Sequence, residues 1–168
     1  MLKIILSVLI LFFTLFNPHS SGADTTPLTL KATFILKFIG FVEFNKKPSV
    51  YQIGYMGSPE TYAEFSQVIL SKEQKKLKFE VIHLTPKSDL SLFNILYFEG
   101  DQFPSHLAMK DVQGLIISDN INGLAKGAII NFITTDETMG FEINNKKAQD
   151  LGIKINSRLL NLAKRVIQ

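Results

Sequence analysis

The stretch that decides the fold is MGFEINNKKAQDLGIKINSRLLNLAKRVIQ, residues 139–168. Residues 139–143 alternate between apolar and polar and predict a closing strand. Residues 144–152 predict a short helix, and residues 153–155 a brief extended link. A final helix begins at Asn156 or Ser157 and ends near Val166, with a predicted buried face comprising Leu159, Leu160, Leu162, Ala163 and Val166. The segment carries no catalytic motif, so we interpret it as the part of the chain that completes a folded domain.

Strands and helices alternate along the chain that precedes this C-terminal segment. A broad apolar stripe predicts a helix over 28–44. The other predicted elements are strands at 51–56, 78–84, 95–98, 112–118, 128–133 and 140–143, and helices at 60–70 and 103–109. This order predicts an α/β fold: a single domain with a mixed, mostly parallel sheet flanked by helices, and a C-terminal β-hairpin followed by two helices.

The first 23 residues have the pattern of a signal peptide. Lys3 provides the positive start, residues 4–16 are largely apolar, and Ser21-Gly22-Ala23 is a small-residue cleavage site. The apolar stretch has 13 residues, fewer than the roughly 20 that a membrane-spanning helix needs. We therefore expect export with cleavage near Ala23, which leaves residues 24–168 as one domain.

Composition narrows the class of protein and its compartment. The chain has no cysteine and no Asn-x-Ser/Thr sequon, which removes disulfides and thiol catalysis and favours a bacterial source. An exported protein of this kind is expected in the periplasm. The formal charge of +3 falls to +2 once Lys3 leaves with the leader, because 17 basic and 15 acidic residues remain. That charge is too small to indicate nucleic acid binding.

No motif in the chain has the spacing of a catalytic, cofactor or metal site. Glycines such as Gly54 and Gly57 match neither the phosphate-loop nor the dinucleotide pattern. His83 and His106 are isolated, so neither belongs to a cluster of metal ligands. Ser58 follows Gly57 in what is better explained as an ordinary turn and helix cap. We therefore predict no catalytic residue, no metal, no cofactor and no enzymatic activity.

Three acidic or amide side chains are candidates for a ligand site. Asp119 and Asn120 follow the carboxyl end of a buried strand, where open α/β sheets place their ligand crevice, and Glu142 is the third candidate. An enzymatic alternative would need two of Glu43, Asp119 and Glu142 to converge across a cleft, as in glycoside hydrolysis. Each of these carboxylates also has a plain structural explanation, such as a lysine partner or a loop cap.

A second candidate site lies at the end of the first predicted helix. Phe41, Glu43 and Phe44 stand beside the basic turn 45–47, which places aromatic side chains next to charge. We predict that these three residues bind a protein partner. The alternative for the two phenylalanines is a place in the apolar core.

Three segments, in the right order, resemble the YfiR-like periplasmic proteins. KATFILKFIGFVEF (residues 31–44) is similar to the family's opening helix, which ends in Phe-Val-Glu-Trp, with Phe44 in place of the tryptophan. The middle match is IISD (116–119) followed by GAIINF (127–132). The most specific match is the end of the chain, FEIN (141–144) through GIKINSRLL (152–160) to Ala163.

The resemblance implies a function as well as a fold. The best understood YfiR-like proteins are not enzymes: they bind the periplasmic domain of a membrane diguanylate cyclase and hold it inactive, which lowers cyclic-di-GMP signalling and biofilm formation. Relatives also occur beside sensor kinases, so the expected partner is the periplasmic domain of either enzyme, and a homodimer is left open. The best understood members carry disulfide cysteines that set their redox response. This chain has no cysteine, which argues against the same redox control. The alternative is a periplasmic sensory domain that binds a small ligand.

Overall fold

The computed structural model describes residues 26–71, 77–104, 112–135 and 138–168. The predicted signal peptide and most of the predicted helix over 103–109 lie outside these residues. The helices are α2 (Pro27–Ile39), α3 (Pro59–Ser71), α4 (Gly123–Lys126), α5 (Asn145–Asp150) and α6 (Ser157–Leu162), with 3-10 turns η1 (Leu90–Leu92) and η2 (Gly100–Gln102). The strands are β1 (Val42–Glu43), β2 (Tyr51–Met56), β3 (Phe79–His83), β4 (Ile95–Phe98), β5 (Leu115–Ser118), β6 (Ile130–Thr135), β7 (Thr138–Asn144), β8 (Lys154–Ile155) and β9 (Arg165–Ile167).

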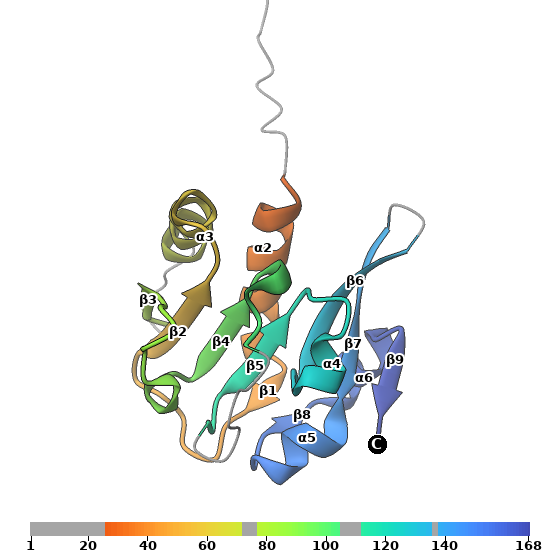
Figure 1. The fold of residues 1–168 in the computed structure, drawn as a ribbon. Coiled ribbons are helices and arrows are strands. Elements are labelled where there is room, and N and C mark those ends of the chain that lie inside the picture. Colours follow the sequence, from red (N-terminus) through yellow and green to blue (C-terminus); the bar gives the residue numbers. More distant parts are fainter. Residues whose placement is uncertain (1–25, 72–76, 105–111, 136–137) are drawn as a thin grey trace, which may run out of the picture.

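The fold is built on a seven-stranded sheet with the order β3-β2-β4-β5-β6-β7-β9. Neighbouring strands are parallel except β6 and β7, which form an antiparallel hairpin. The hairpin is followed by α5 and α6, as Figure 1 shows. The predicted mixed, mostly parallel sheet and its C-terminal hairpin with two following helices are therefore confirmed.

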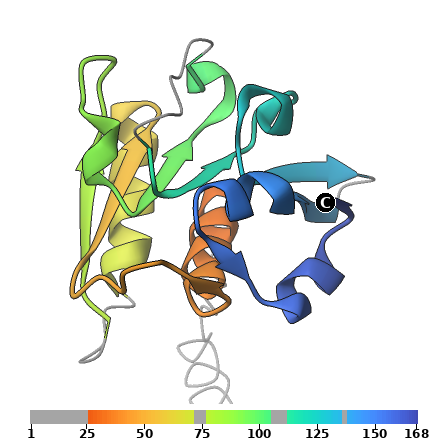
Figure 2. The same ribbon diagram turned by 90° about the horizontal axis from the view of Figure 1, so that it is seen from below.

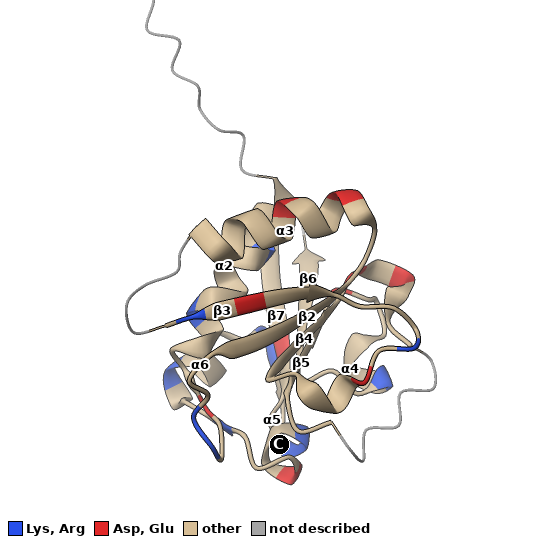
Figure 3. Cartoon of the chain, turned by 90° about the vertical axis from the view of Figure 1, so that its left-hand side faces the viewer, with Lys and Arg blue, Asp and Glu red and all other residues tan. Residues whose placement is uncertain are grey.

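The central strands are buried on both faces, and each face has its own apolar core. Tyr55 and Tyr97 belong to the larger core, beneath α2 and α3, whereas their neighbours Met56 and Phe98 belong to a second core on the face of α4. This division follows from the pleat, which points successive side chains to opposite faces. Strands β2, β4 and β5 contain no charged residue, and Figure 3 shows the charged residues around them.

The helix predicted over 28–44 is shorter in the structure. α2 ends at Ile39, and the Gly40 N–H closes its last turn. Val42 and Glu43 then form β1, which pairs antiparallel with β8. The apolar pattern continued through Val42 because that side chain is buried, but it is buried from a strand whose partner lies far along the chain. Local periodicity contains no information about that partner.

The final helix is also shorter than predicted. α6 ends at Leu162, and residues 165–167 form β9, a parallel edge strand beside β7. Leu162, predicted to be buried, is 66% exposed. Pairing with β9 supplies hydrogen-bond partners to an edge of β7 that would otherwise be open. Residues 165–167 fit helical spacing as well as strand alternation, so the neighbouring strand β7 decides between the two.

Candidate functional site

Asp119, a predicted ligand-binding residue, is held by the chain itself. Its carboxylate accepts hydrogen bonds from the Tyr97 hydroxyl (3.0 Å) and the Gly100 N–H (2.5 Å), and it forms a salt bridge with Lys31. Lys31 belongs to α2, so this contact fastens the first helix to the carboxyl end of β5. Both side chains are largely buried, at 18% exposure for Lys31 and 11% for Asp119.

A second carboxylate, Glu99, lies at the same end of the sheet, directly after the carboxyl end of β4. It accepts hydrogen bonds from the Tyr55 hydroxyl (2.7 Å) and the Thr61 hydroxyl (2.8 Å). Burial raises the pKa of Tyr55, and burial together with the charge of Asp119 raises the pKa of Tyr97. Both tyrosines are therefore neutral donors to carboxylates at neutral pH.

Asn120 is buried, at 3% exposure, and serves the loop around it. Its amide nitrogen donates to the Gly100 carbonyl (3.0 Å) and to Asp101 (3.1 Å), and its amide oxygen accepts the Asn122 N–H (2.9 Å). The crevice predicted after β5 is thus lined by groups that bond to one another. The assignment of Asp119 and Asn120 to a ligand site stays a prediction.

Glu142 lies apart from Asp119, on the other face of the sheet. It faces Asn131 across the β6–β7 pairing, and Asn131 in turn faces Ser118. This row of side chains points toward α4, because Gly123 packs on Asn131. Asp119 contacts Lys31 of α2 instead. Two of the three carboxylates considered for an enzymatic cleft therefore point to opposite faces.

The third carboxylate, Glu43, lies in β1 opposite Lys154 of β8. β1 stands at the edge of the molecule where α2 ends and β2 begins, as Figure 2 shows from below. Asp119 lies at the opposite end of the sheet, directly after the carboxyl end of β5. Within the described residues, Glu43, Asp119 and Glu142 thus occupy three separate environments.

The predicted partner-binding residues lie together on the segment that links α2 to β2. Phe41 and Phe44 are half-buried and pack against the larger core, while Glu43 is exposed. The Phe44 ring makes an edge contact with Tyr51, with 6.0 Å between the ring centres. The Phe41 carbonyl accepts the Asn156 N–H (2.9 Å), which ties this segment to α6. We name residues 40–47 the β1 segment.

Three surface cavities surround the β1 segment. The largest, of about 440 Å³, is lined by Phe44 and Tyr51, and a second of about 210 Å³ is lined by Phe41 and Lys154. The third, of about 190 Å³, lies between Phe44 and the loops that precede β4 and β5. The partly exposed aromatic side chains therefore stand between hollows in the surface.

The comparisons with known proteins identify the family. The family model described as YfiR/HmsC-like matches residues 28–164. The chain belongs to the YfiR/HmsC-like family. No curated protein matches it in sequence.

Solved structures similar to this YfiR/HmsC-like chain support the fold. One is a conserved domain protein from Vibrio cholerae, with 13% identity and a TM-score of 0.59. Another is an ABC domain in complex with L-Trp from Streptococcus pneumoniae, with 14% identity and a TM-score of 0.54. Each match covers 84% of this chain, and this chain spans 60% of the length of either structure.

In the part of the YfiR/HmsC-like chain that the structure describes, no group of three or more His, Asp or Glu side chains is placed to hold a metal ion. Among the same residues, no helix is long and apolar enough to cross a membrane.

Sequence reasoning missed several residues of this YfiR/HmsC-like chain that the structure brings together. Lys31 bonds to Asp119 and Glu99 accepts a hydrogen bond from Tyr55 at the carboxyl end of the parallel strands. Lys47, Tyr51 and Leu77 line the cavity of about 440 Å³ beside the β1 segment. The only signal for Lys31 was a charged residue inside an apolar helix. Tyr51 and Leu77 gave no signal, because a residue that lines a cavity looks like a core residue in a sequence.

Proposed function

We propose that this protein is a periplasmic regulator that binds the periplasmic domain of an inner-membrane signalling enzyme and holds it inactive. The enzyme is a diguanylate cyclase, so binding lowers cyclic-di-GMP output. The partner binds the β1 segment through Phe41, Glu43 and Phe44. Family membership supports the regulatory role. The choice of binding surface rests on one observation: the partly exposed Phe41 and Phe44 lie between three cavities in the surface.

The proposed regulation sets the binding free energy that this surface has to supply. Moving an enzyme from mostly active to mostly inactive takes a differential affinity of about 5 kcal/mol. Fully burying one phenylalanine contributes about 1.5–3 kcal/mol, and Phe41 and Phe44 are already mostly buried, so completing their burial contributes at most roughly 1–2 kcal/mol in total. The remainder must come from neighbouring contacts, in which the exposed Glu43 pairs with a basic group of the partner.

The test is capture of the partner from membranes. The tagged, exported protein is incubated with solubilised inner membranes, and the captured proteins are identified by mass spectrometry. We expect a membrane diguanylate cyclase, captured by the wild-type protein and lost with Phe44→Asp. Ile121→Asp is the matched control, because Ile121 is an apolar residue at the opposite edge of the sheet that is 92% exposed.

A second variant separates binding from folding. Phe44 packs partly on the core, so Phe44→Asp also lowers stability, whereas Glu43 is exposed and Glu43→Lys leaves the core intact. We expect Glu43→Lys to weaken capture and to raise cellular cyclic-di-GMP toward the level of a deletion strain. Capture of no signalling enzyme by the wild-type protein would contradict the proposal. So would undiminished capture by both variants.

A further inference from the structure

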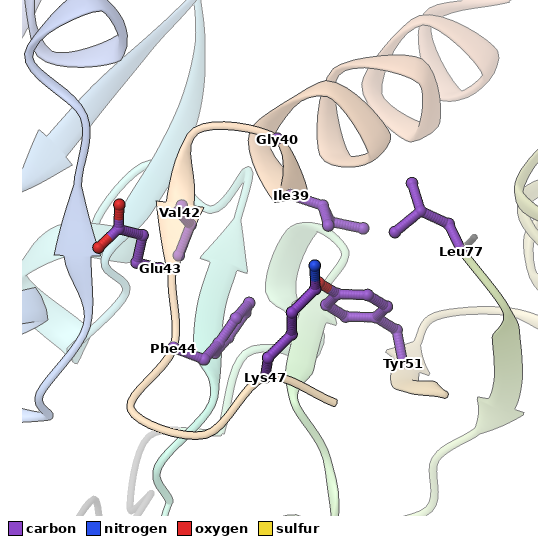
Figure 4. A pocket seen from close by; sticks show the side chains of 8 residues that line it. All are labelled: Ile39, Gly40, Val42, Glu43, Phe44, Lys47, Tyr51 and Leu77. Atoms are coloured by element: carbon purple, nitrogen blue, oxygen red, sulfur yellow. The ribbon is translucent and has the colours of Figure 1, made fainter. Parts of the chain in front are cut away.

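The largest cavity beside the β1 segment has the size and lining of a small-molecule site. Its volume of about 440 Å³ lies within the range of roughly 300–1,000 Å³ that is usual for ligand pockets. Ile39, Val42 and Tyr51 form buried walls, and Phe44 and Leu77 add apolar surface. The side chains come from α2, the β1 segment, β2 and the residue that leads into β3, as Figure 4 shows. The cavity is therefore a partly open hollow lined by several elements.

Two hydrogen-bond donors, from Lys47 and Tyr51, line this cavity. Figure 4 shows the Lys47 amino group and the Tyr51 hydroxyl projecting into the cavity, while the Glu43 carboxylate points away from it. Within the described part of the chain, Lys47 has no salt bridge and the Tyr51 hydroxyl has no hydrogen bond. Burial raises the pKa of Tyr51, so its hydroxyl keeps its proton at neutral pH. The cavity thus combines one cation and one neutral donor with apolar walls.

We propose that this cavity binds a small carboxylate carried on an apolar body, such as an aryl-alkyl or branched aliphatic acid. The Lys47 ammonium and the Tyr51 hydroxyl hold the carboxylate, and Ile39, Phe44 and Leu77 hold the apolar body. A charge-assisted hydrogen bond to the ammonium is stronger than one between neutral groups, so it favours the anion over a neutral analogue. This site is distinct from the crevice predicted at Asp119, and it does not depend on the proposed partner.

Selectivity follows from the orientation of Glu43, the acidic residue among those that line the cavity, whose carboxylate is turned away from Lys47 and Tyr51. The carboxylate of Glu43 points toward β8, so an ammonium group on the ligand meets Lys47 without a compensating negative charge. A cation of the same shape is therefore repelled. A neutral alcohol keeps the apolar contacts but loses the charge interaction. Comparison of these three compounds isolates the contribution of the carboxylate.

The experiment is a titration of the isotope-labelled exported protein, followed by two-dimensional NMR of the backbone amides. The probe is 4-phenylbutyrate, and 4-phenyl-1-butanol and 4-phenylbutylamine are its matched analogues. We expect saturable shifts at the amides of Gly40, Phe44 and Leu77 with a Kd on the order of 1 mM or below, which corresponds to about −4 kcal/mol. We expect the alcohol to bind about tenfold more weakly, and the amine to give no saturable shift.

Variants then assign the anion contact. Lys47→Met keeps the apolar stem and removes the charge, and we expect it to raise the Kd for 4-phenylbutyrate about tenfold. Lys46→Met is the control, because Lys46 is an exposed lysine that lines a different cavity. Tyr51→Phe is expected to raise the Kd several-fold. The inference is overturned by equal binding of the alcohol and the acid, by an unchanged Kd in Lys47→Met, or by the absence of saturable shifts at these amides.

Discussion

Arg165 binds both carboxylate oxygens of Glu142, with Nε at 2.8 Å and Nη2 at 3.0 Å. The two residues are in register across β7 and β9, so the ion pair fastens the last strand to the sheet. The Lys164 N–H adds a hydrogen bond to the Phe141 carbonyl (2.8 Å). These contacts stabilise the end of the chain as a strand rather than as a continuation of α6.

The ion pair predicts how the last strand responds to mutation. Glu142→Gln removes the charge that holds the Arg165 guanidinium, so we expect β9 to separate from β7 more often. Amides 165–167 should then exchange with deuterium several-fold faster in hydrogen-exchange mass spectrometry, with little change in α2. Arg158→Gln, a substitution of an exposed arginine in α6, is the control and should leave these amides unchanged. Unchanged exchange in Glu142→Gln would show that backbone pairing alone holds the strand.

The Lys31–Asp119 salt bridge predicts a large loss of stability. Asp119→Asn leaves the Lys31 ammonium largely buried without a counter-charge, and we expect a loss of about 3 kcal/mol of unfolding free energy. Asp150→Asn is the matched control, because the pair Lys146–Asp150 is exposed and should contribute at most about 0.5 kcal/mol. Urea unfolding of the two variants measures both values. Equal, small losses would mean that Asp119 contributes no more than a surface pair.

The close contact between Gly123 and Asn131 predicts that mutations at these two positions have non-additive effects on stability. A Cβ on Gly123 would lie 2.0 Å from Asn131 Oδ1, a buried oxygen without a hydrogen-bond partner in the described structure. We expect Gly123→Ala to cost about 1–3 kcal/mol through overpacking. In Gly123→Ala/Asn131→Ala the clash disappears, so the double variant should be more stable than the sum of the single losses predicts. Additive losses in urea unfolding would refute the close contact.

The buried tyrosines predict a loss of stability at alkaline pH. The pKa of Tyr97 is raised in the folded protein, so this contribution to stability is complete below about pH 10, the pKa of an unfolded tyrosine. Above that pH the unfolded chain loses the tyrosine proton first, and stability falls by up to about 1.4 kcal/mol per pH unit for this group. We therefore expect urea midpoints to fall more steeply between pH 9.5 and pH 11 (about half a unit below to one unit above that pKa) in the wild type than in Tyr97→Phe. Parallel curves would mean that Tyr97 does not couple folding to pH.

The predicted site residues, like the ends of the first and last helices, depend on partners that lie far away in the sequence. Asp119, Asn120 and Glu142 were selected for their chemistry and position, and the structure gives each of them bonds within the chain. Those bonds join residues up to 88 positions apart, as for Lys31 and Asp119. Residues that line a cavity show no sequence signal of their own, because an apolar side chain has the same pattern whether it faces a core or a hollow.

The sequence by itself determined the six strands from β2 to β7, the helices α3 and α5 and the family. Continuous apolar runs such as 95–98, together with turn residues at their ends, depend only on neighbouring residues, and local patterning is sufficient for them. Tertiary structure alone decided that the first helix stops at Ile39, that residues 165–167 are a strand, and that a cavity opens beside Tyr51. Each of these depends on a partner distant in sequence: β8 for β1, β7 for β9, and Leu77 for Tyr51. Pairing across space overrides local propensity because it satisfies backbone hydrogen bonds and buries apolar surface that the isolated segment leaves in water.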